Sequence, residues 1–131
     1  MSFERDPQLD AQLVNEFVQV AHSDLARTQE MLEADPRLIN ACWNWGGDDW
    51  ETAVGGAAHM GNKQIAEYLL AHGAHLDLFC AAMLGKKEIV AAFIADDPTV
   101  IHKKGPHGIP LIAHAKAGGQ DDIVSLIEAN R

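Results

Sequence analysis

The sequence predicts an all-α protein built from stacked, antiparallel pairs of short helices. Alanine is abundant while aromatic residues make up only 6% of the chain, a composition that suits closely packed helices better than a β-sandwich. In one segment after another, apolar residues recur at the three- and four-residue spacing of a buried helix face. A chain of 131 residues is long enough to bury about two thirds of its unfolded surface, so we expect one domain over residues 1–131.

Two helices are expected before residue 40. Asp6-Pro7 is a favourable helix start, because the carboxylate can cap the first turn and the fixed φ of proline suits it. The apolar stripe of this helix comprises Leu9, Leu13, Val14, Phe17 and Val18. Asp24 caps the next helix, and Asp35-Pro36 closes it. Its inward face comprises Leu25, Thr28, Met31 and Leu32.

Three further units each consist of a short helix, a glycine turn and a second helix. The first of them opens at Thr52, turns at Gly61-Asn62 and stops at Gly73, a residue that readily adopts the left-handed conformation. The other two turn at Gly85 and at Gly118-Gly119. Their second helices carry Ile65, Ala66, Leu69 and Leu70, then Ile89, Val90, Phe93 and Ile94, then Ile123, Val124, Leu126 and Ile127. Helices this short cannot bury their faces alone, so the pairs must stack.

The unit over residues 52–74 carries a family pattern. Its sequence, TAVGGAAHMGNKQIAEYLLAHGA, resembles the ankyrin repeat T-P-L-H-x-A-A-x-x-G-x-x-x-I-V-x-x-L-L-x-x-G-A, with Ala53 in place of the proline and Gly55 in place of the histidine. Matches in the other units are Ala81, Ala82, Gly85, Ile89 and Val90; Pro110, Leu111, Ala115, Gly118, Ile123 and Val124; and Ala21, Leu32 and Asp35-Pro36. The resemblance implies an ankyrin-repeat solenoid with short hairpin-like fingers and repeats over roughly 7–39, 40–75, 76–104 and 105–131.

The spacing of the units predicts where the fingers lie. The units begin at Thr52, Leu76 and Ile109, which are 24 and 33 residues apart. Because 33 is the ankyrin period, the shorter step predicts that one finger is missing. We therefore expect a long finger over roughly 40–51, a bare gap near 75–77 and another finger over roughly 99–108.

Charge and composition exclude several classes of function. The net charge is −9, and residues 1–51 hold eleven acids against three bases, so we expect no binding to nucleic acid. No apolar stretch approaches the length of a membrane span, and Met1–Asp6 lacks the pattern of a secretory signal, so a cytoplasmic location is expected.

Cys42 and Cys80 match no C-x-x-C pattern and are expected to be reduced, small core residues.

Catalytic and metal-binding motifs are not found. The seven histidines are His22, His59, His72, His75, His102, His107 and His114. None forms H-x-x-x-H and no thiolate pair stands beside them, so we expect no metal ligands and no cofactor. His59 with Asp48, Asp49 and Glu51 could form an acid–base site, but the repeat register places them on an open rim with ordinary pKa values. Gly55-Gly56 and Gly118-Gly119 indicate close helix approach and turns. We expect no catalytic residues and no enzyme.

The stretch from Trp43 to Trp50 is the strongest binding signal, because it holds three tryptophans, a residue type enriched among hot spots. At least one indole should be exposed, while the others could pack on neighbouring fingers. Met83 and Leu84 either line the concave groove or fill the gap left by the missing finger. The expected partner-binding residues are Trp43, Trp45, Asp48, Asp49, Trp50, Glu51, His59, Met60, Met83, Leu84 and Lys116.

The sequence therefore favours a non-enzymatic, monomeric protein-interaction module whose acidic surface suits a basic protein partner. The alternative is a small-ligand or metal-binding regulatory protein that uses Trp45, Trp50, His59 and the nearby carboxylates. A closed apolar pocket under the first finger would favour the alternative, and an open groove would favour a protein partner. Weak self-association through the end of the stack at Arg131 is a third alternative.

Overall fold

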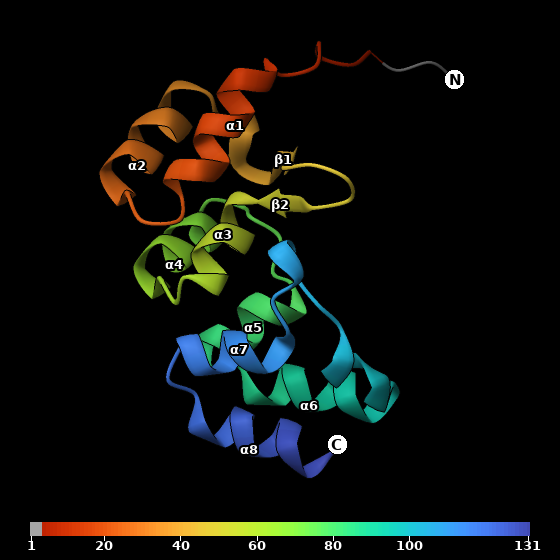
Figure 1. Cartoon of the computed structure of the whole chain (residues 1–131). Coiled ribbons are helices and arrows are strands. Elements are labelled where there is room, and N and C mark those ends of the chain that lie inside the picture. The colour runs from red at the N-terminus through yellow and green to blue at the C-terminus, as the bar shows by residue number, and fades with distance from the viewer. Residues whose placement is uncertain (1–3) are drawn as a thin grey trace.

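The computed structural model describes residues 4–131. The first half of Met1–Asp6, the segment in which no secretory signal is expected, lies outside the described residues. Figure 1 shows helices arranged in successive pairs, from the N-terminal pair at one end to the C-terminal helix at the other. The four pairs are α1 (Ala11–Val20) with α2 (Leu25–Ala34), α3 (Ala53–His59) with α4 (Lys63–Ala71), α5 (Leu78–Leu84) with α6 (Lys87–Asp96), and α7 (Leu111–Ala117) with α8 (Asp121–Ala129). The mostly helical architecture is confirmed. Among the described residues, none of the helices combines the length and the apolar character needed to cross a membrane.

Short polar side chains begin most of these helices. Asp24, Thr52 and Asn62 each accept a hydrogen bond from the backbone N–H three residues ahead, as an N-cap residue does. The predicted start at Asp6-Pro7 is wrong, because α1 begins at Ala11. There Asp10 accepts from the Leu13 N–H at 3.1 Å and caps the first turn.

Two fingers project from the stack. The first is a hairpin of β1 (Cys42–Asn44) and β2 (Trp50–Thr52), paired antiparallel with Trp43 opposite Glu51, and it confirms the predicted long finger. The second follows the 3-10 turn η2 (Pro98–His102) and holds the short turn η3 (Pro106–Gly108), closed by a bridge between Lys104 and Pro110. It lies slightly later than the predicted range.

Between α4 and α5 the chain forms no finger, as the short repeat step predicts. One side chain from the preceding unit holds this connection in place. Asn40, at the end of the 3-10 turn η1 (Pro36–Asn40), donates to the Gly73 carbonyl at 3.1 Å and accepts from the His75 N–H at 2.8 Å. The bare backbone of the gap is therefore satisfied by the first unit.

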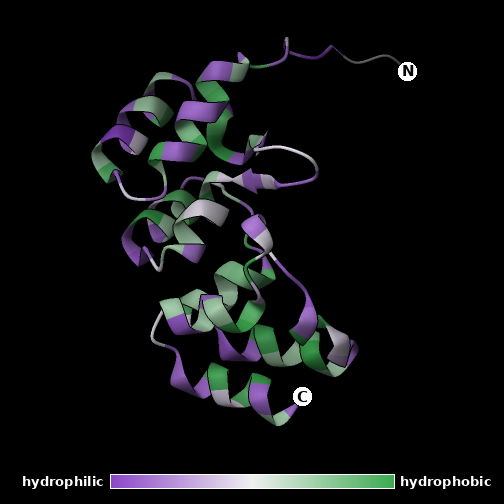
Figure 2. Cartoon of the chain, viewed as in Figure 1, coloured by the Kyte–Doolittle hydropathy of each residue, from purple (hydrophilic) through white to green (hydrophobic). Residues whose placement is uncertain are grey.

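The core consists of two hydrophobic clusters. One spans the first two helix pairs and reaches Cys80 and Met83, and the other spans the last two pairs. Figure 2 shows apolar and hydrophilic residues sharing the same helices, as expected when one face of each is buried. Cys80 is buried as predicted, but Cys42, the first residue of β1, is exposed.

Candidate functional site

The first finger presents one well-exposed indole. Trp50 is 55% exposed and Trp45 39% exposed, whereas Trp43 is half-buried against the first hydrophobic cluster. The expectation that at least one indole is exposed is therefore confirmed. Trp50 lines two open depressions: an apolar one of about 530 Å³ beside Leu9 and Val14, and one of about 320 Å³ lined in part by three aspartates.

The residues expected in the groove do not all face solvent. Met60 is 54% exposed and Lys116 is exposed, but Met83 is fully buried and Leu84 is half-buried. Met83 therefore belongs to the core and not to an open groove. The turn between α7 and α8 covers it, since the Gln120 side chain there donates to the Met83 carbonyl at 3.1 Å.

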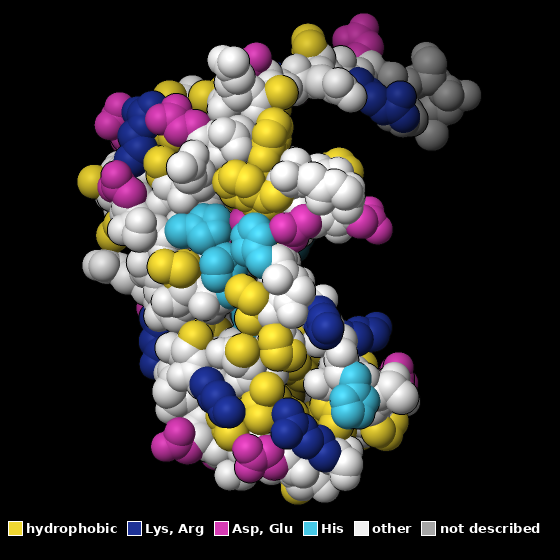
Figure 3. Space-filling model, in the orientation of Figure 1, with side chains coloured by type: hydrophobic (Ala, Val, Ile, Leu, Met, Phe, Trp, Pro, Cys, Tyr) yellow, Lys and Arg dark blue, Asp and Glu magenta, His cyan; other side chains and the backbone are white. Residues whose placement is uncertain are grey.

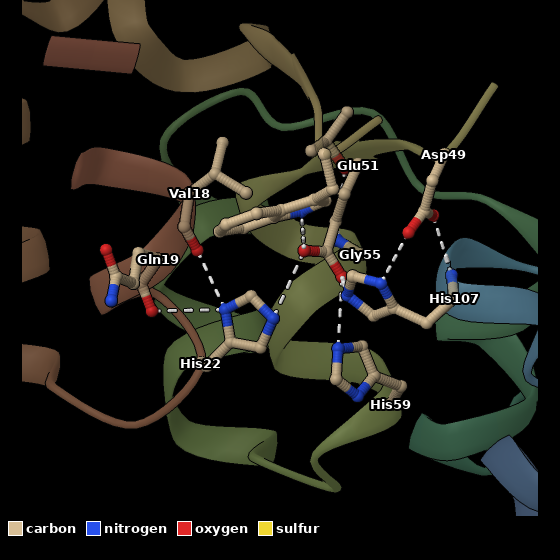
Figure 4. Close-up of polar contacts among 10 residues, drawn as sticks. Val18, Gln19, His22, Asp49, Glu51, Gly55, His59 and His107 are labelled. Atoms are coloured by element: carbon tan, nitrogen blue, oxygen red, sulfur yellow. Dashed lines mark hydrogen bonds and ion pairs between the residues drawn. The ribbon is translucent and has the colours of Figure 1, made fainter. Parts of the chain in front are cut away.

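Beneath the first finger, three imidazoles surround one buried carboxylate. Glu51 is only 2% exposed. Its Oε1 lies 3.1 Å from His22 Nε2, and its Oε2 lies 3.0 Å from His59 Nε2 and 3.3 Å from His107 Nε2 (Figure 4). These four residues are called the histidine cluster. Trp45 Nε1 donates to Glu51 Oε1 at 2.9 Å, so an indole of the finger also helps to hold the carboxylate.

The cluster joins four separate parts of the chain. His22 follows the last turn of α1, Glu51 lies in β2, His59 ends α3, and His107 comes from the second finger. Figure 3 shows a patch of histidine side chains just below the first finger, with acidic side chains beside it. The ring of His107 is one third exposed, so the cluster reaches the surface on this side while Glu51 stays inside.

The outer ring nitrogens of two of these histidines have acceptors of their own. His22 Nδ1 lies 2.8 Å from the Val18 carbonyl and 3.1 Å from the Gln19 carbonyl. His107 Nδ1 lies 2.7 Å from Asp49 Oδ2, and the His107 backbone N–H donates to Asp49 Oδ1 at 2.7 Å. Carbonyl and carboxylate oxygens only accept, so in both rings Nδ1 carries a proton and Nε2 faces Glu51.

Asp49 also fixes the backbone of the second finger. His107 has φ 62° and ψ 19°, and it is the only residue other than glycine with a positive φ among the described residues. This conformation costs energy for a side chain with a Cβ. The paired hydrogen bonds from His107 to Asp49 offset that cost, and they lower the pKa of the Asp49 carboxyl.

The pKa values within the cluster are far from ordinary for two groups. Burial by itself raises the pKa of Glu51, but the contacts from His22, His59 and Trp45 outweigh it and hold this pKa well below its usual range. The contact with Glu51 is the main cause of a raised pKa for His22. The prediction of an open rim with ordinary pKa values is therefore wrong for Glu51. The second finger folds back and covers this carboxylate.

Only part of the cluster was predicted from the sequence. His59 was expected beside Asp48, Asp49 and Glu51, and the structure does bring His59 to Glu51. Asp49 supports His107 from outside, while Asp48 is exposed and makes no contact with the cluster. His22 and His107 were missed, because each lies far along the chain from Glu51. Pro106-His107-Gly108 could have indicated a histidine on a turn, but not its target.

The remaining histidines lie elsewhere. His72, His75 and His102 are exposed and take no part in the cluster. His114 is fully buried on α7, where its Nδ1 lies 2.9 Å from the Pro110 carbonyl and burial lowers its pKa. The four ligand-type atoms of the histidine cluster, by contrast, all lie within 4.8 Å of one another, close enough to share protons or to hold a metal ion.

Comparison with known proteins does not place this geometry in a family. No protein-family model matches the chain, and no curated protein matches it. A function must therefore be argued from the finger and the histidine cluster themselves.

Proposed function

We propose that the chain is an ankyrin-type stack that works as a non-enzymatic protein-interaction module, with the first finger as its main contact surface. The observation that carries this proposal is the indole of Trp50, which is 55% exposed in β2, opposite Asn44 and next to the tip of that finger. Large indoles left exposed beside a depression are typical of binding hot spots. Four helix pairs, one within each unit expected from the resemblance, support the ankyrin-type stack.

Rigidity of the finger supports this role. At its tip, Asn44 donates to the Gly47 carbonyl at 2.8 Å and accepts from the Gly46 N–H at 2.9 Å. Beside the tip, the Trp45 side chain is bonded to the buried Glu51 carboxylate. A finger whose loop is fixed in this way loses little conformational entropy when a partner binds, so more of the contact energy appears as affinity.

Charge around Trp50 favours a basic partner. The depression of about 320 Å³ next to the indole is lined in part by Asp48, Asp49 and Asp77, whose acidic groups outnumber the single base there, Lys104. The apolar depression of about 530 Å³ on the other side of the indole could take an apolar anchor of the same partner. An apolar centre with a charged rim is a common interface arrangement, and an acidic rim speeds encounter with a basic surface.

The cellular setting belongs to the same proposal. Both thiols are free, which fits a reducing compartment such as the cytoplasm. A monomer is the proposed state, with the acidic surface opposing association of identical copies.

The test is affinity capture from the native lysate with three forms of the protein. These are the wild type, Trp50→Ala and the control Phe93→Ala, which removes another large aromatic side chain, 46% exposed on α6. Once a partner is purified, Trp50→Ala should weaken its binding by about thirtyfold or more, corresponding to about 2 kcal/mol. Phe93→Ala should bind as the wild type does. An unchanged affinity for Trp50→Ala would exclude the first finger as the contact.

A metal ion is a second candidate ligand. The specific observation in its favour is the convergence of three imidazole nitrogens on a buried carboxylate.

A further inference from the structure

We propose that His22, Glu51, His59 and His107 form a binding site for one divalent transition-metal ion of the Zn²⁺ class, with the three Nε2 atoms and a carboxylate oxygen as its ligands. The proposal is independent of the interaction surface at Trp50. It rests on spacing, on unsatisfied atoms and on the support given to each ligand.

The spacing of the ligand atoms is close to that of an occupied site. Zn²⁺ holds imidazole nitrogen and carboxylate oxygen at about 2.0–2.1 Å, so neighbouring ligands of a tetrahedral site lie about 3.3 Å apart. The three contacts from Nε2 to a Glu51 oxygen are 3.0, 3.1 and 3.3 Å. No two of the four ligand atoms lie more than 4.8 Å apart, so the largest distance between them must shorten by about 1.5 Å at most to reach the spacing of an occupied site.

Two atoms at the centre of the cluster lack hydrogen-bond partners. Glu51 Oε2 and His59 Nε2 are both buried, lie 3.0 Å apart and are not aligned for a hydrogen bond. A buried polar atom without a partner carries a desolvation cost. A metal ion between them would satisfy both at once, because it needs lone pairs and no donated hydrogen.

The outer contacts prepare the histidines for metal binding. Metal-binding histidines usually donate their second ring N–H to a carbonyl or a carboxylate, which fixes the tautomer and the ring orientation. His22 does so to the Val18 and Gln19 carbonyls, and His107 does so to Asp49. Trp45 holds the other oxygen of Glu51. Because Nδ1 of His22 and of His107 is bonded outward, Nε2 is the ring nitrogen that faces the Glu51 carboxylate, and a metal ion can take the place of a proton on it.

The donor set indicates the class of metal. Three imidazoles with one carboxylate suit Zn²⁺ and its neighbours, whereas Mg²⁺ and Ca²⁺ prefer oxygen ligands only. Neither free thiol belongs to the cluster. Glu51 and Asp49 together supply two negative charges, which balance a divalent ion. The partly exposed rings of His107 and His22 give such an ion a route from solvent.

The test is a titration of the chelator-treated, full-length chain with Zn²⁺, in which calorimetry measures the affinity. Elemental analysis of the loaded protein then measures how much Zn²⁺ each chain holds. We expect one Zn²⁺ per chain at micromolar concentrations, a higher melting temperature, and, with Co²⁺ as a substitute, the visible absorption of a four- or five-coordinate ion. His107→Asn should weaken Zn²⁺ binding at least a hundredfold; asparagine tolerates the left-handed φ at this position. Asp49→Asn should weaken it about 10- to 100-fold and keep the stoichiometry.

The matched control is His102→Asn, the same substitution at an exposed histidine outside the cluster, and it should change the affinity less than twofold. Circular dichroism of each variant shows whether it is folded. His22→Asn provides a second ligand variant if His107→Asn does not fold. No uptake of Zn²⁺ by the folded wild type would overturn the proposal and leave a network of shared protons. Equal affinity in the wild type and in both ligand variants would also overturn it, because the ion would then lie elsewhere.

Discussion

Adjacent glycines in α3 offer a direct test of how the helix stack positions His22. Gly55 and Gly56 are both buried in this helix. A Cβ on Gly56 would lie 2.6 Å from His22 Cε1 and 2.8 Å from His22 Nδ1, closer than real Cβ atoms approach. A Cβ on Gly55 would have Thr52 Oγ1 at 3.2 Å as its nearest neighbour, with the next atoms at 3.7 Å. Only Gly56→Ala therefore moves the imidazole.

The size of the expected stability change follows from the contacts of the His22 imidazole. Replacing glycine by alanine inside a helix gains about 0.5–1 kcal/mol, and both variants receive this gain. In Gly56→Ala the ring must shift by about 1 Å, which breaks its hydrogen bond to the Val18 carbonyl and removes a partner of the buried Glu51. These losses cost about 1–3 kcal/mol. We expect Gly56→Ala to be about 1–2 kcal/mol less stable than the wild type, and Gly55→Ala to stay close to the wild type, because the tight contact of its Cβ with the Thr52 hydroxyl offsets the gain.

The assay is urea unfolding followed by circular dichroism, with Zn²⁺ affinity measured on the same samples. Gly56→Ala should unfold at lower urea concentration with an unchanged slope, and its Zn²⁺ affinity should fall at least tenfold. Gly55→Ala should match the wild type in Zn²⁺ affinity. If Gly56→Ala were as stable as Gly55→Ala, the close approach of His22 to α3 would not exist in solution, and the geometry of the cluster would need revision.

Three further outcomes are expected. In the native protein a thiol reagent at pH 8 should modify the exposed Cys42 but not Cys80, because burial raises the pKa of the Cys80 thiol to about 12, and both should react in denaturant. Contact with Glu51 raises the pKa of His22, so this ion pair stabilises the metal-free protein below pH 6.5 and is lost as the pH rises through the raised pKa. The free energy of unfolding of chelator-treated protein should therefore fall over that pH range. Glu51→Gln should remove this pH dependence of stability. Deleting residues 1–38 should lower the free energy of unfolding by several kcal/mol and lower the melting temperature, because it exposes the apolar face of the second unit. An unchanged melting temperature would show that the first helix pair does not stabilise the stack.

Helix pairs and turns were predictable because their causes are local. Thr52 and Asp24 cap helices by hydrogen bonds that reach only three residues ahead, and the apolar period follows from helix geometry. Gly119, in the turn between α7 and α8, also has a local cause, since its φ is +69°. Gly118 beside it has a tertiary cause, because a Cβ there would lie against the Met83 carbonyl of α5. The start of α1 was misplaced because Asp6 and Asp10 are both able to cap a helix, and sequence pattern alone does not choose between them.

Exposure of the finger residues was predictable only in part. Three tryptophans near three acids predicted an exposed indole, and alternation along a strand separates the faces of the hairpin. Which indole stays exposed depends on what lies beneath each face. Trp43 packs against the core of the first two units, whereas Trp50 lies between two open depressions and stays 55% exposed. That difference arises from packing between units and not from the finger's own sequence.

By itself, the sequence determined the mostly helical architecture, the positions of the glycine turns, the long first finger and the bare gap, because each follows from local hydrogen bonding or from the repeat period. Only the tertiary structure decided the histidine cluster. Asp49 and His107 are 58 residues apart, and they meet because the second finger folds back against α3 and the first finger. The burial of Glu51 and its surrounding imidazoles depends on that meeting, since a contact between distant segments leaves no periodic or local signal in the chain.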